Sequence, residues 1–240
     1  MTASIGDRMK ANYEDRYRIK LTRRTPVIIR LDGKAFHTLT KKCEKPFDKA
    51  FCDCMDKTAF ELCTDIQGAK CAYVQSDEIS ILLTDFDNLE TEAWFDYNLQ
   101  KLVSVSASLA TFYFLQGWET YYHPDLRGLV SFDARAFNVP KDEVCNYFIW
   151  RQQDWKRNSV EMLARAHFSH LELHKKNQSD MHEMLHTKGV NWAKLSERYK
   201  NGHFTYQECM GWEQESAPIF TQNRQVIEKY LISREDKEVS

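Results

Sequence analysis

Three acidic side chains in the first third of the chain have the type and placement needed to bind hard divalent cations. Asp32 directly follows Pro26–Leu31, a short β-branched run that is typical of a strand. Asp77 and Glu78 fall between two further short apolar runs, so we expect them at the tip of a tight hairpin. Carboxylate oxygens are the ligands that Mg²⁺ prefers, and two such ions can clamp the attacking and leaving oxygens of a phosphoryl transfer.

The elements that would position these acids follow from the hydrophobic periodicity. Two helices alternate with four short strands, which predicts an α+β fold with a ferredoxin-like β-α-β-β-α-β unit. The first and third strands of that unit are central neighbours, so the three acids can converge. The predicted elements are the strand Pro26–Leu31, the helix Asp48–Ile66, the strands Lys70–Gln75 and Ile79–Thr84, the helix Trp94–Leu115 and the strand Leu129–Val139.

The remainder of the chain has a different pattern. From Lys141 onward we predict helices joined by polar turns, without strong strands. A domain boundary is expected near Pro140, with a catalytic domain at residues 1–140 and a mainly helical region at residues 141–240.

The segment Asp32–His37 has features of a phosphate-binding loop. Gly33 lets the backbone approach a ligand closely, and successive backbone N–H groups in such a turn bind anionic oxygens. Lys34 and Lys45 would add positive charge. Asp-Gly is also a common turn pair, so a lone solvated turn is the competing interpretation.

Bulk composition excludes several classes of protein. The formal net charge is −2, so any RNA contact must use local basic patches rather than a global field. No run of residues is long and apolar enough for a membrane span. Seven cysteines without an apolar leader segment predict reduced thiols in a cytoplasmic protein.

Five short motifs together resemble the tRNA-histidine guanylyltransferase family, and above all its bacterial and archaeal guanylyltransferase-like branch. Their order and spacing are specific, although each motif alone is weak. The motifs are Arg30–His37 (RLDGKAFH), Lys45–Asp48 (KPFD), Gln75–Glu78 (QSDE), Phe132–Arg135 (FDAR) and Trp150–Asp154 (WRQQD).

The resemblance implies a polymerase-palm fold that works in the 3′-to-5′ direction. Such enzymes adenylylate a 5′-monophosphorylated tRNA with ATP, and the 3′-hydroxyl of GTP or another nucleotide then attacks the activated end. The resemblance also implies two Mg²⁺ ions, with Mn²⁺ as a substitute, a fingers-like RNA-contacting region at residues 141–240, and a homotetramer without membrane association.

Individual roles carry over onto matching positions. The resemblance implies that Asp32, Asp77 and Glu78 are catalytic, and that Asp32, Gly33 and Asp77 bind metal. The implied nucleotide-binding residues are Asp32, Gly33, Lys34, Ala35, Phe36, His37, Lys45, Asp48, Ser76 and Asp77. The candidate phosphate or RNA contacts are Arg30, Lys101, Arg135, Arg151, Lys156, Arg157 and Asn158.

One departure from the family concerns substrate choice. Eukaryotic members that recognise the histidine anticodon carry His-Ile-Asn-Asn after the WRQ motif, whereas this chain has Lys156 in place of that histidine and matches only at Asn158. This difference favours repair of 5′-truncated tRNAs over strict tRNA-histidine specificity.

Other functions stay open from the residues alone. A palm-fold nucleotidyl cyclase, or a polymerase that does not act on tRNA, would use the same acids. A non-catalytic RNA-binding module would gain nothing from placing Asp77 beside Glu78, where like charges repel. His182–His186 matches the HExxH pattern of zinc proteases, but no spacing picks out a third ligand, so a solvated helix is favoured.

Overall fold

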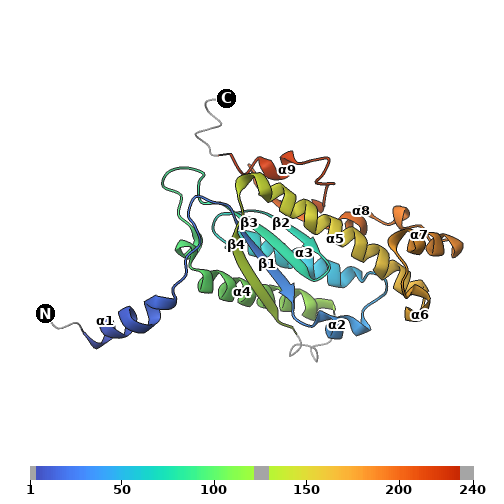
Figure 1. The fold of residues 1–240 in the computed structure, drawn as a ribbon, viewed down its shortest axis with the longest axis horizontal. Coiled ribbons are helices and arrows are strands. Elements are labelled where there is room, and N and C mark those ends of the chain that lie inside the picture. The colour runs from blue at the N-terminus through green and yellow to red at the C-terminus, as the bar shows by residue number, and fades with distance from the viewer. Residues whose placement is uncertain (1–3, 122–129, 233–240) are drawn as a thin grey trace.

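One six-stranded sheet, flanked by helices, forms the body of the molecule (Figure 1). The structure is a computed structural model that describes residues 4–121 and 130–232. The strands, in the order β4-β1-β3-β2-β5-β6, are all antiparallel to their neighbours. Their bounds are β1 Val27–Gly33, β2 Ala69–Gln75, β3 Glu78–Leu83, β4 Phe132–Asn138, β5 His203–Glu208 and β6 Gly211–Ser216.

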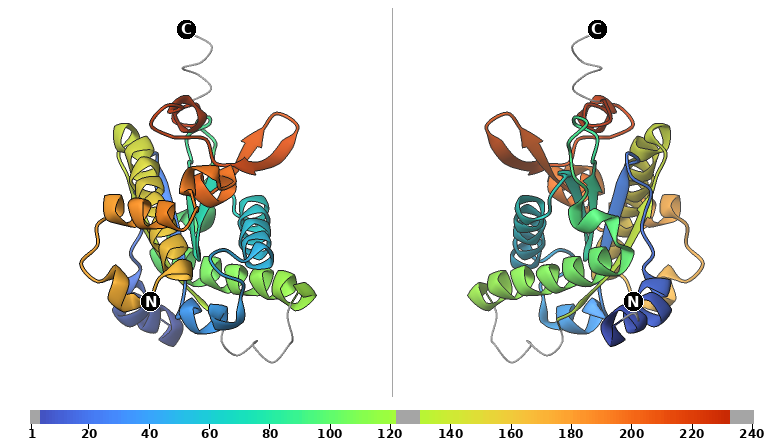
Figure 2. Two further views of the ribbon diagram at one scale, coloured as in Figure 1. Left: turned by 90° about the vertical axis from the view of Figure 1, so that its right-hand side faces the viewer. Right: turned by 90° about the vertical axis from the view of Figure 1, so that its left-hand side faces the viewer.

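The two faces of the sheet have separate cores. Val27, Ile29 and Leu31 point to the face covered by α3 (Lys49–Asp65) and α4 (Leu99–Tyr121). Ile28 points to the opposite face, which α5 (Lys141–His167) covers. Figure 2 shows α5 on one side of the sheet and α3 on the other. This alternation follows from the period of two along a strand.

The sequence predicted the elements of the first 140 residues closely. The two long helices and four strands appear in the predicted order, as a mixture of helices and antiparallel sheet. Leu129, the first residue of the predicted fourth strand, lies outside the described residues. Short helical segments join these elements: α2 Phe36–Leu39, a turn of 3₁₀ helix at Thr40–Lys42 and another at Trp94–Tyr97.

The prediction that the chain from Lys141 onward has no strong strands is wrong. Strand β5 pairs with β2, and β6 pairs with β5, so the C-terminal region extends the sheet of the N-terminal one. The alternating pattern of these strands is weak because β6 is an exposed edge strand rich in glutamate and glutamine. The other C-terminal elements are helices: α6 His170–Leu173, α7 Gln178–Thr187, a 3₁₀ turn at Trp192–Lys194, α8 Glu197–Asn201 and α9 Gln225–Glu228.

An N-terminal helical arm stands away from the body (Figure 1). It consists of α1 (Ile5–Met9), a π-helical turn at Lys10–Glu14 and a 3₁₀ turn at Asp15–Tyr17, and none of its side chains is buried. Across the described part of the chain, no helix is both long and apolar enough to cross a membrane.

Candidate active site

The end of β1 brings carboxylates from three strands into one row. Asp32 lies directly opposite Glu78 on β3 and directly opposite Asp133 on β4. Side chains of directly paired residues point to the same face of a sheet. The row therefore lies on the face that α5 covers, at the edge of the sheet where β1 ends.

Asp77 reaches the same place from the hairpin between β2 and β3. The backbone N–H of Gly33 donates a hydrogen bond of 3.0 Å to the carbonyl oxygen of Asp77, which fixes the hairpin tip against the end of β1. A Cβ atom at Gly33 would lie 2.5 Å from the ring of Phe36, so only glycine fits this close approach. Asp32 and Asp77 thus converge as the sequence predicted.

The electrostatics of Asp32 and Asp77 favour a bound cation. Burial raises the pKa of Asp77; the nearby charge of Asp32 adds to this, and a hydrogen bond from Ser76 opposes it. Burial also raises the pKa of Asp32, and Asp133 adds to that effect, whereas three arginines lower it. Both negative charges are therefore costly without a partner.

The donor atoms at this point fit magnesium. The carboxylates of Asp32 and Asp77 and the carbonyl of Gly33 offer hard oxygen donors, which would suit Mg²⁺ or Mn²⁺ better than zinc. Within residues 4–121 and 130–232, no group of three or more His, Cys, Asp or Glu side chains has the geometry of a metal cluster.

Glu78, expected from the sequence to be the third acid, has other contacts. Its two carboxylate oxygens accept hydrogen bonds of 2.7 Å each from Nε and Nη2 of Arg151 on α5. Both side chains are buried. Glu78 is therefore bound to Arg151, whereas its neighbour Asp77 lines the cavity.

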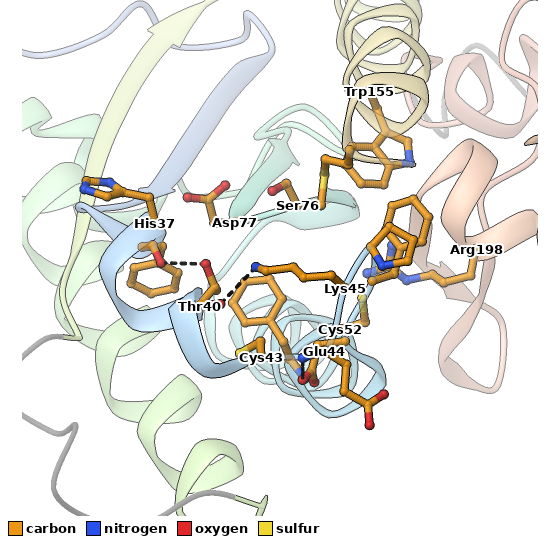
Figure 3. Close-up of a pocket in the computed structure, with 16 residues that line it drawn as sticks. His37, Thr40, Cys43, Glu44, Lys45, Cys52, Ser76, Asp77, Trp155 and Arg198 are labelled. Atoms are coloured by element: carbon orange, nitrogen blue, oxygen red, sulfur yellow. Dashed lines mark hydrogen bonds between the residues drawn. The ribbon is translucent and has the colours of Figure 1, made fainter. Parts of the chain in front are cut away.

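A cavity of about 250 Å³ opens beside the acid pair (Figure 3). Ser76, Asp77 and His37 lie along one side of it, and Trp155 and Arg198 lie along the other. Of the predicted nucleotide-binding residues, six line this cavity: Phe36, His37, Lys45, Asp48, Ser76 and Asp77. Its size and its mixed apolar and polar lining suit part of a nucleotide.

Two of the six lining residues have structural contacts of their own. Asp48 caps α3 by accepting a hydrogen bond of 2.8 Å from the Phe51 amide, and it accepts a second one of 2.9 Å from the Glu44 amide. Lys45 donates through Nζ to the carbonyl oxygen of Thr40 at 3.0 Å. Both residues therefore shape the loop that borders the cavity.

The remaining predicted loop residues, Asp32 to Ala35, lie beside the cavity rather than in its wall. Lys34 and Ala35 are exposed, and the Lys34 amide donates to the carbonyl oxygen of Ser131 at 2.9 Å. Ala35 adopts a left-handed backbone conformation with φ of 56°. Such a conformation in a residue other than glycine is a strained feature that is common at ligand sites.

The predicted basic residues do not gather in one place. Arg30 and Arg135 are direct cross-strand partners, one step along the sheet from the acid row. Lys101 lies farther from the acid row. Thr111, on the same helix, accepts a hydrogen bond from the amide of Phe132, which is the strand partner of Gly33. The rise of the helix places Lys101 roughly 15 Å from Thr111 along α4.

The other candidates lie on α5. Arg151 is buried against Glu78, while Arg157 and Asn158 are exposed and Lys156 is partly exposed. All three are accessible to solvent, and Arg157 donates a hydrogen bond of 2.6 Å to Asp154.

Sequence reasoning missed several residues of the site. Asp133 was quoted only as part of a motif, and its place opposite Asp32 requires the strand register. Cys43 and Cys52, with Trp155, Met162 and Arg198 from the C-terminal region, also line the cavity. Trp155 also packs edge-on against Phe47 at 6.2 Å between ring centres.

The HExxH segment is confirmed as a helix of the C-terminal region. Its first histidine, His182, packs against the ring of Trp192 at 6.0 Å. The described residues place no third ligand beside His182 and His186. The seven cysteines, which all lie in the described part of the chain, form no disulfide bond.

An antiparallel sheet with a carboxylate pair at a strand end, beside a cavity that suits part of a nucleotide, fits the geometry of a nucleotidyltransferase. The sequence matches the profile of the family described as "tRNAHis guanylyltransferase" over residues 6–140, which is more than half of the chain. The tRNA(His) guanylyltransferase of Schizosaccharomyces pombe is 30% identical over 208 residues, covering 81% of this chain and 78% of that protein.

Solved structures agree with this relationship. A bacterial tRNA(His) guanylyltransferase-like protein in complex with ATP is 47% identical, with a TM-score of 0.90 over 95% of this chain and 99% of that one. Another, in complex with GTP, is 42% identical with a TM-score of 0.80, at the same coverage. The chain belongs to the tRNA(His) guanylyltransferase family, and it is a nucleotidyltransferase.

Proposed function

We propose that this protein adds nucleotides in the 3′-to-5′ direction to the 5′ end of tRNA, with the opposite strand as template. The observation that carries the proposal is the convergence of Asp32 and Asp77 beside the cavity that Ser76 and His37 line. The related bacterial proteins solved with ATP and with GTP support nucleotides as the occupants of this cavity.

We further propose that residues 1–140 form a polymerase palm of ferredoxin-like topology. The strand order β4-β1-β3-β2, with α3 and α4 on one face, supports this assignment. Residues 141–240 would form the fingers-like, RNA-contacting region, although β5 and β6 of that region also complete the sheet.

The proposed reaction has two steps. A 5′-phosphate oxygen of the RNA attacks the α-phosphorus of ATP, which forms an adenylylated 5′ end and releases pyrophosphate. The 3′-hydroxyl of the incoming nucleotide, such as GTP, then attacks the 5′-phosphorus and displaces AMP. Asp32, Asp77 and the Gly33 carbonyl would hold two Mg²⁺ ions, or Mn²⁺ in their place, which neutralise charge on the reacting phosphates.

The chain's own residues bind and orient the reactants. Lys45 and His37, with the Ser76 hydroxyl, border the cavity where a triphosphate would lie. Trp155 and Met162 contribute apolar surface at which water is excluded from the base. Holding the reacting groups in this way lowers the entropic part of the barrier.

The proposed substrates are 5′-truncated tRNAs of several identities. Lys156 and Arg157 stand where the histidine-specific members carry His-Ile-Asn-Asn, and positive charge binds phosphate without reading base sequence. A strict tRNA-histidine guanylyltransferase is the alternative within the same chemistry.

A homotetramer is also part of the proposal. The arm exposes Ile5, Met9, Tyr13 and Tyr17 at helical spacing. Helix α4 has no charged residue between Lys101 and Glu119, although Phe112 is 54% exposed. Apolar surfaces of this kind are typical of contacts between subunits. The lack of disulfide bonds among the seven cysteines of the described residues supports a cytoplasmic location.

One assay tests the proposal against its alternatives. The protein is incubated with 5′-monophosphorylated, 5′-truncated tRNA, ATP labelled in the α-phosphate and Mg²⁺. The proposal predicts a labelled, adenylylated RNA that is extended when further nucleotides are added. A labelled cyclic nucleotide or free dinucleotide would instead indicate a cyclase or a polymerase independent of tRNA, and gel retardation without labelled product would indicate an RNA-binding module.

A further inference from the structure

The contact between Glu78 and Arg151 joins the hairpin of the acid pair to α5. Two parallel hydrogen bonds of 2.7 Å connect the guanidinium of Arg151 to both carboxylate oxygens of Glu78. Arg151 is 6% exposed and Glu78 is 7% exposed, so water screens this ion pair poorly. Paired guanidinium and carboxylate groups in this planar geometry are strongly directional.

A second arginine flanks the same carboxylate. Nε of Arg30 lies 4.0 Å from Oε2 of Glu78, and this buried nitrogen has no hydrogen-bond partner among the described residues. Glu78 is thus enclosed by two positive groups. A divalent cation would have to approach against both of them, so Glu78 offers a poor ligand, in contrast to the adjacent Asp77.

The pair also has the right position to act through Asp77. Glu78 is the first residue of β3 and follows Asp77 directly, so holding the Glu78 side chain fixes one end of the hairpin loop. The other fixed point is the hydrogen bond from Gly33 to the Asp77 carbonyl. Helix α5 is held to β3 a second time by the 2.8 Å hydrogen bond between the hydroxyls of Tyr147 and Ser80.

We infer that Glu78 binds no metal ion and that Glu78 and Arg151 form a positioning pair, which holds the Asp77 loop against the end of β1. Arg151 is then a positioning residue for nucleotidyl transfer, placed on α5 and acting on the hairpin. This inference rests on the proposed function, because it assigns the cation to Asp32 and Asp77.

The test compares three variants: Glu78→Gln, Arg151→Gln and the double variant. Arg151→Gln removes both short hydrogen bonds to the buried Glu78 carboxylate and leaves it only Arg30 at 4.0 Å and the Ser80 hydroxyl at 3.4 Å, whereas the double variant leaves two neutral amides that can bond each other. Misplacing a reacting group by an ångström costs about 100-fold in rate. We expect that loss in single-turnover 5′-adenylylation for Arg151→Gln, and recovery of at least tenfold in the double variant.

A measurement of Mn²⁺ binding tests the inference without relying on catalytic activity. Mn²⁺ affinity in the presence of ATP is measured by electron paramagnetic resonance. Asp77→Asn should lose most of the Mn²⁺ binding, whereas Glu78→Gln and the double variant should stay within about twofold of the wild type, since no ligand has been removed. If Arg151→Gln fails to fold, Glu78→Gln and the double variant still decide the question.

Arg165→Gln is the matched control. It makes the same substitution on the same helix and breaks an exposed ion pair with Glu161, so rate and Mn²⁺ affinity should not change. The inference is overturned if Glu78→Gln weakens Mn²⁺ binding as much as Asp77→Asn does, or if the double variant recovers no activity. Wild-type protein that binds Mn²⁺ in the expected pattern but never adenylylates RNA would contradict the proposed function and leave the positioning pair standing.

Discussion

The two faces of the sheet use the same strands for different purposes. The face under α3 and α4 is lined by aliphatic and aromatic side chains such as Ile29, Leu62 and Phe114. The face under α5 carries the row of Glu78, Asp32 and Asp133 and, one step away, Arg30 and Arg135. Burying charge is costly unless it is paired; Glu78 is buried but paired with Arg151, Asp32 is partly buried, and Asp133 and Arg135 are exposed. The α5 face therefore carries charged groups at the end of β1, whereas the other face carries a hydrophobic core.

The largest expected effect is on the α5 face. Asp77→Asn should abolish nucleotide addition, because removing a ligand loses several kcal/mol of stabilisation of transition-state charge. Its thermal midpoint should be no lower than that of the wild type, since a partly buried, like-charged neighbour of Asp32 has been neutralised. Single-turnover rates and thermal unfolding measure the two effects. Near-normal turnover would show that Asp77 is not a catalytic residue.

The opposite face should show the reverse behaviour. Leu62→Ala removes a fully buried side chain between α3 and the sheet, so the free energy of unfolding should fall by roughly 2–5 kcal/mol. The rate per folded molecule should not change. Denaturant unfolding and active-site titration test this pair of outcomes. A specific loss of activity in fully folded protein would show that the faces are not separable.

A smaller effect is expected where the α5 side meets RNA. Lys156→Ala should weaken tRNA binding by roughly 1 kcal/mol, to a similar degree for all tRNAs, because a lost phosphate contact carries no sequence information. The slope of the logarithm of affinity against the logarithm of salt concentration should become shallower by about one unit. Binding titrations at several salt concentrations give both numbers. A loss confined to one tRNA would assign Lys156 to base recognition.

His203 provides a pH test on the α3 side. Burial lowers its pKa below the ordinary value, while the charge of Asp56 opposes that shift. The unfolded chain therefore binds more protons than the folded one as pH falls through the ordinary histidine range, so folding stability should decrease on acidification. His203→Asn should flatten this part of the profile of unfolding free energy against pH. An unchanged profile in the variant would remove His203 as the cause.

The expected absence of an effect is equally informative. His182→Ala combined with His186→Ala should leave nucleotide addition unchanged, and a zinc chelator should not inhibit the wild type, because the proposed ligands are hard oxygens. Removal of Mg²⁺ should stop the reaction, and Mn²⁺ should restore it. Bound zinc together with loss of activity in the double variant would revive the metalloprotease interpretation.

The acid pair of Asp32 and Asp77 could be predicted from the sequence because local signals determine the position of each residue. A β-branched run that ends in Asp32-Gly33, and a hairpin with Asp77 at its tip, can be recognised within a few residues. The place of Asp133 could not be predicted in this way, because it depends on register across three strands. The role of Glu78 depends on Arg151, which lies 73 positions along the chain.

The C-terminal region shows the same limit on a larger scale. Strand β5 pairs with β2, far away in sequence, and β6 has polar residues on an exposed edge, so neither strand has a strong local pattern. Trp155 and Arg198 join the cavity only because α5 and α8 fold back over the N-terminal region. Long-range contacts, rather than local propensity, determined these features.

Sequencing of the 5′ ends of reacted tRNA tests the central claim most directly. A 5′-truncated tRNA that does not accept histidine is incubated with Mg²⁺, ATP and all four nucleoside triphosphates, in parallel with full-length tRNA-histidine and with the Asp77→Asn variant. The proposed function predicts that the wild type restores the missing nucleotides according to the opposite strand, and that Asp77→Asn adds none. Unchanged 5′ ends in every tRNA would contradict it, and extension of tRNA-histidine alone would identify a dedicated histidine-tRNA enzyme instead.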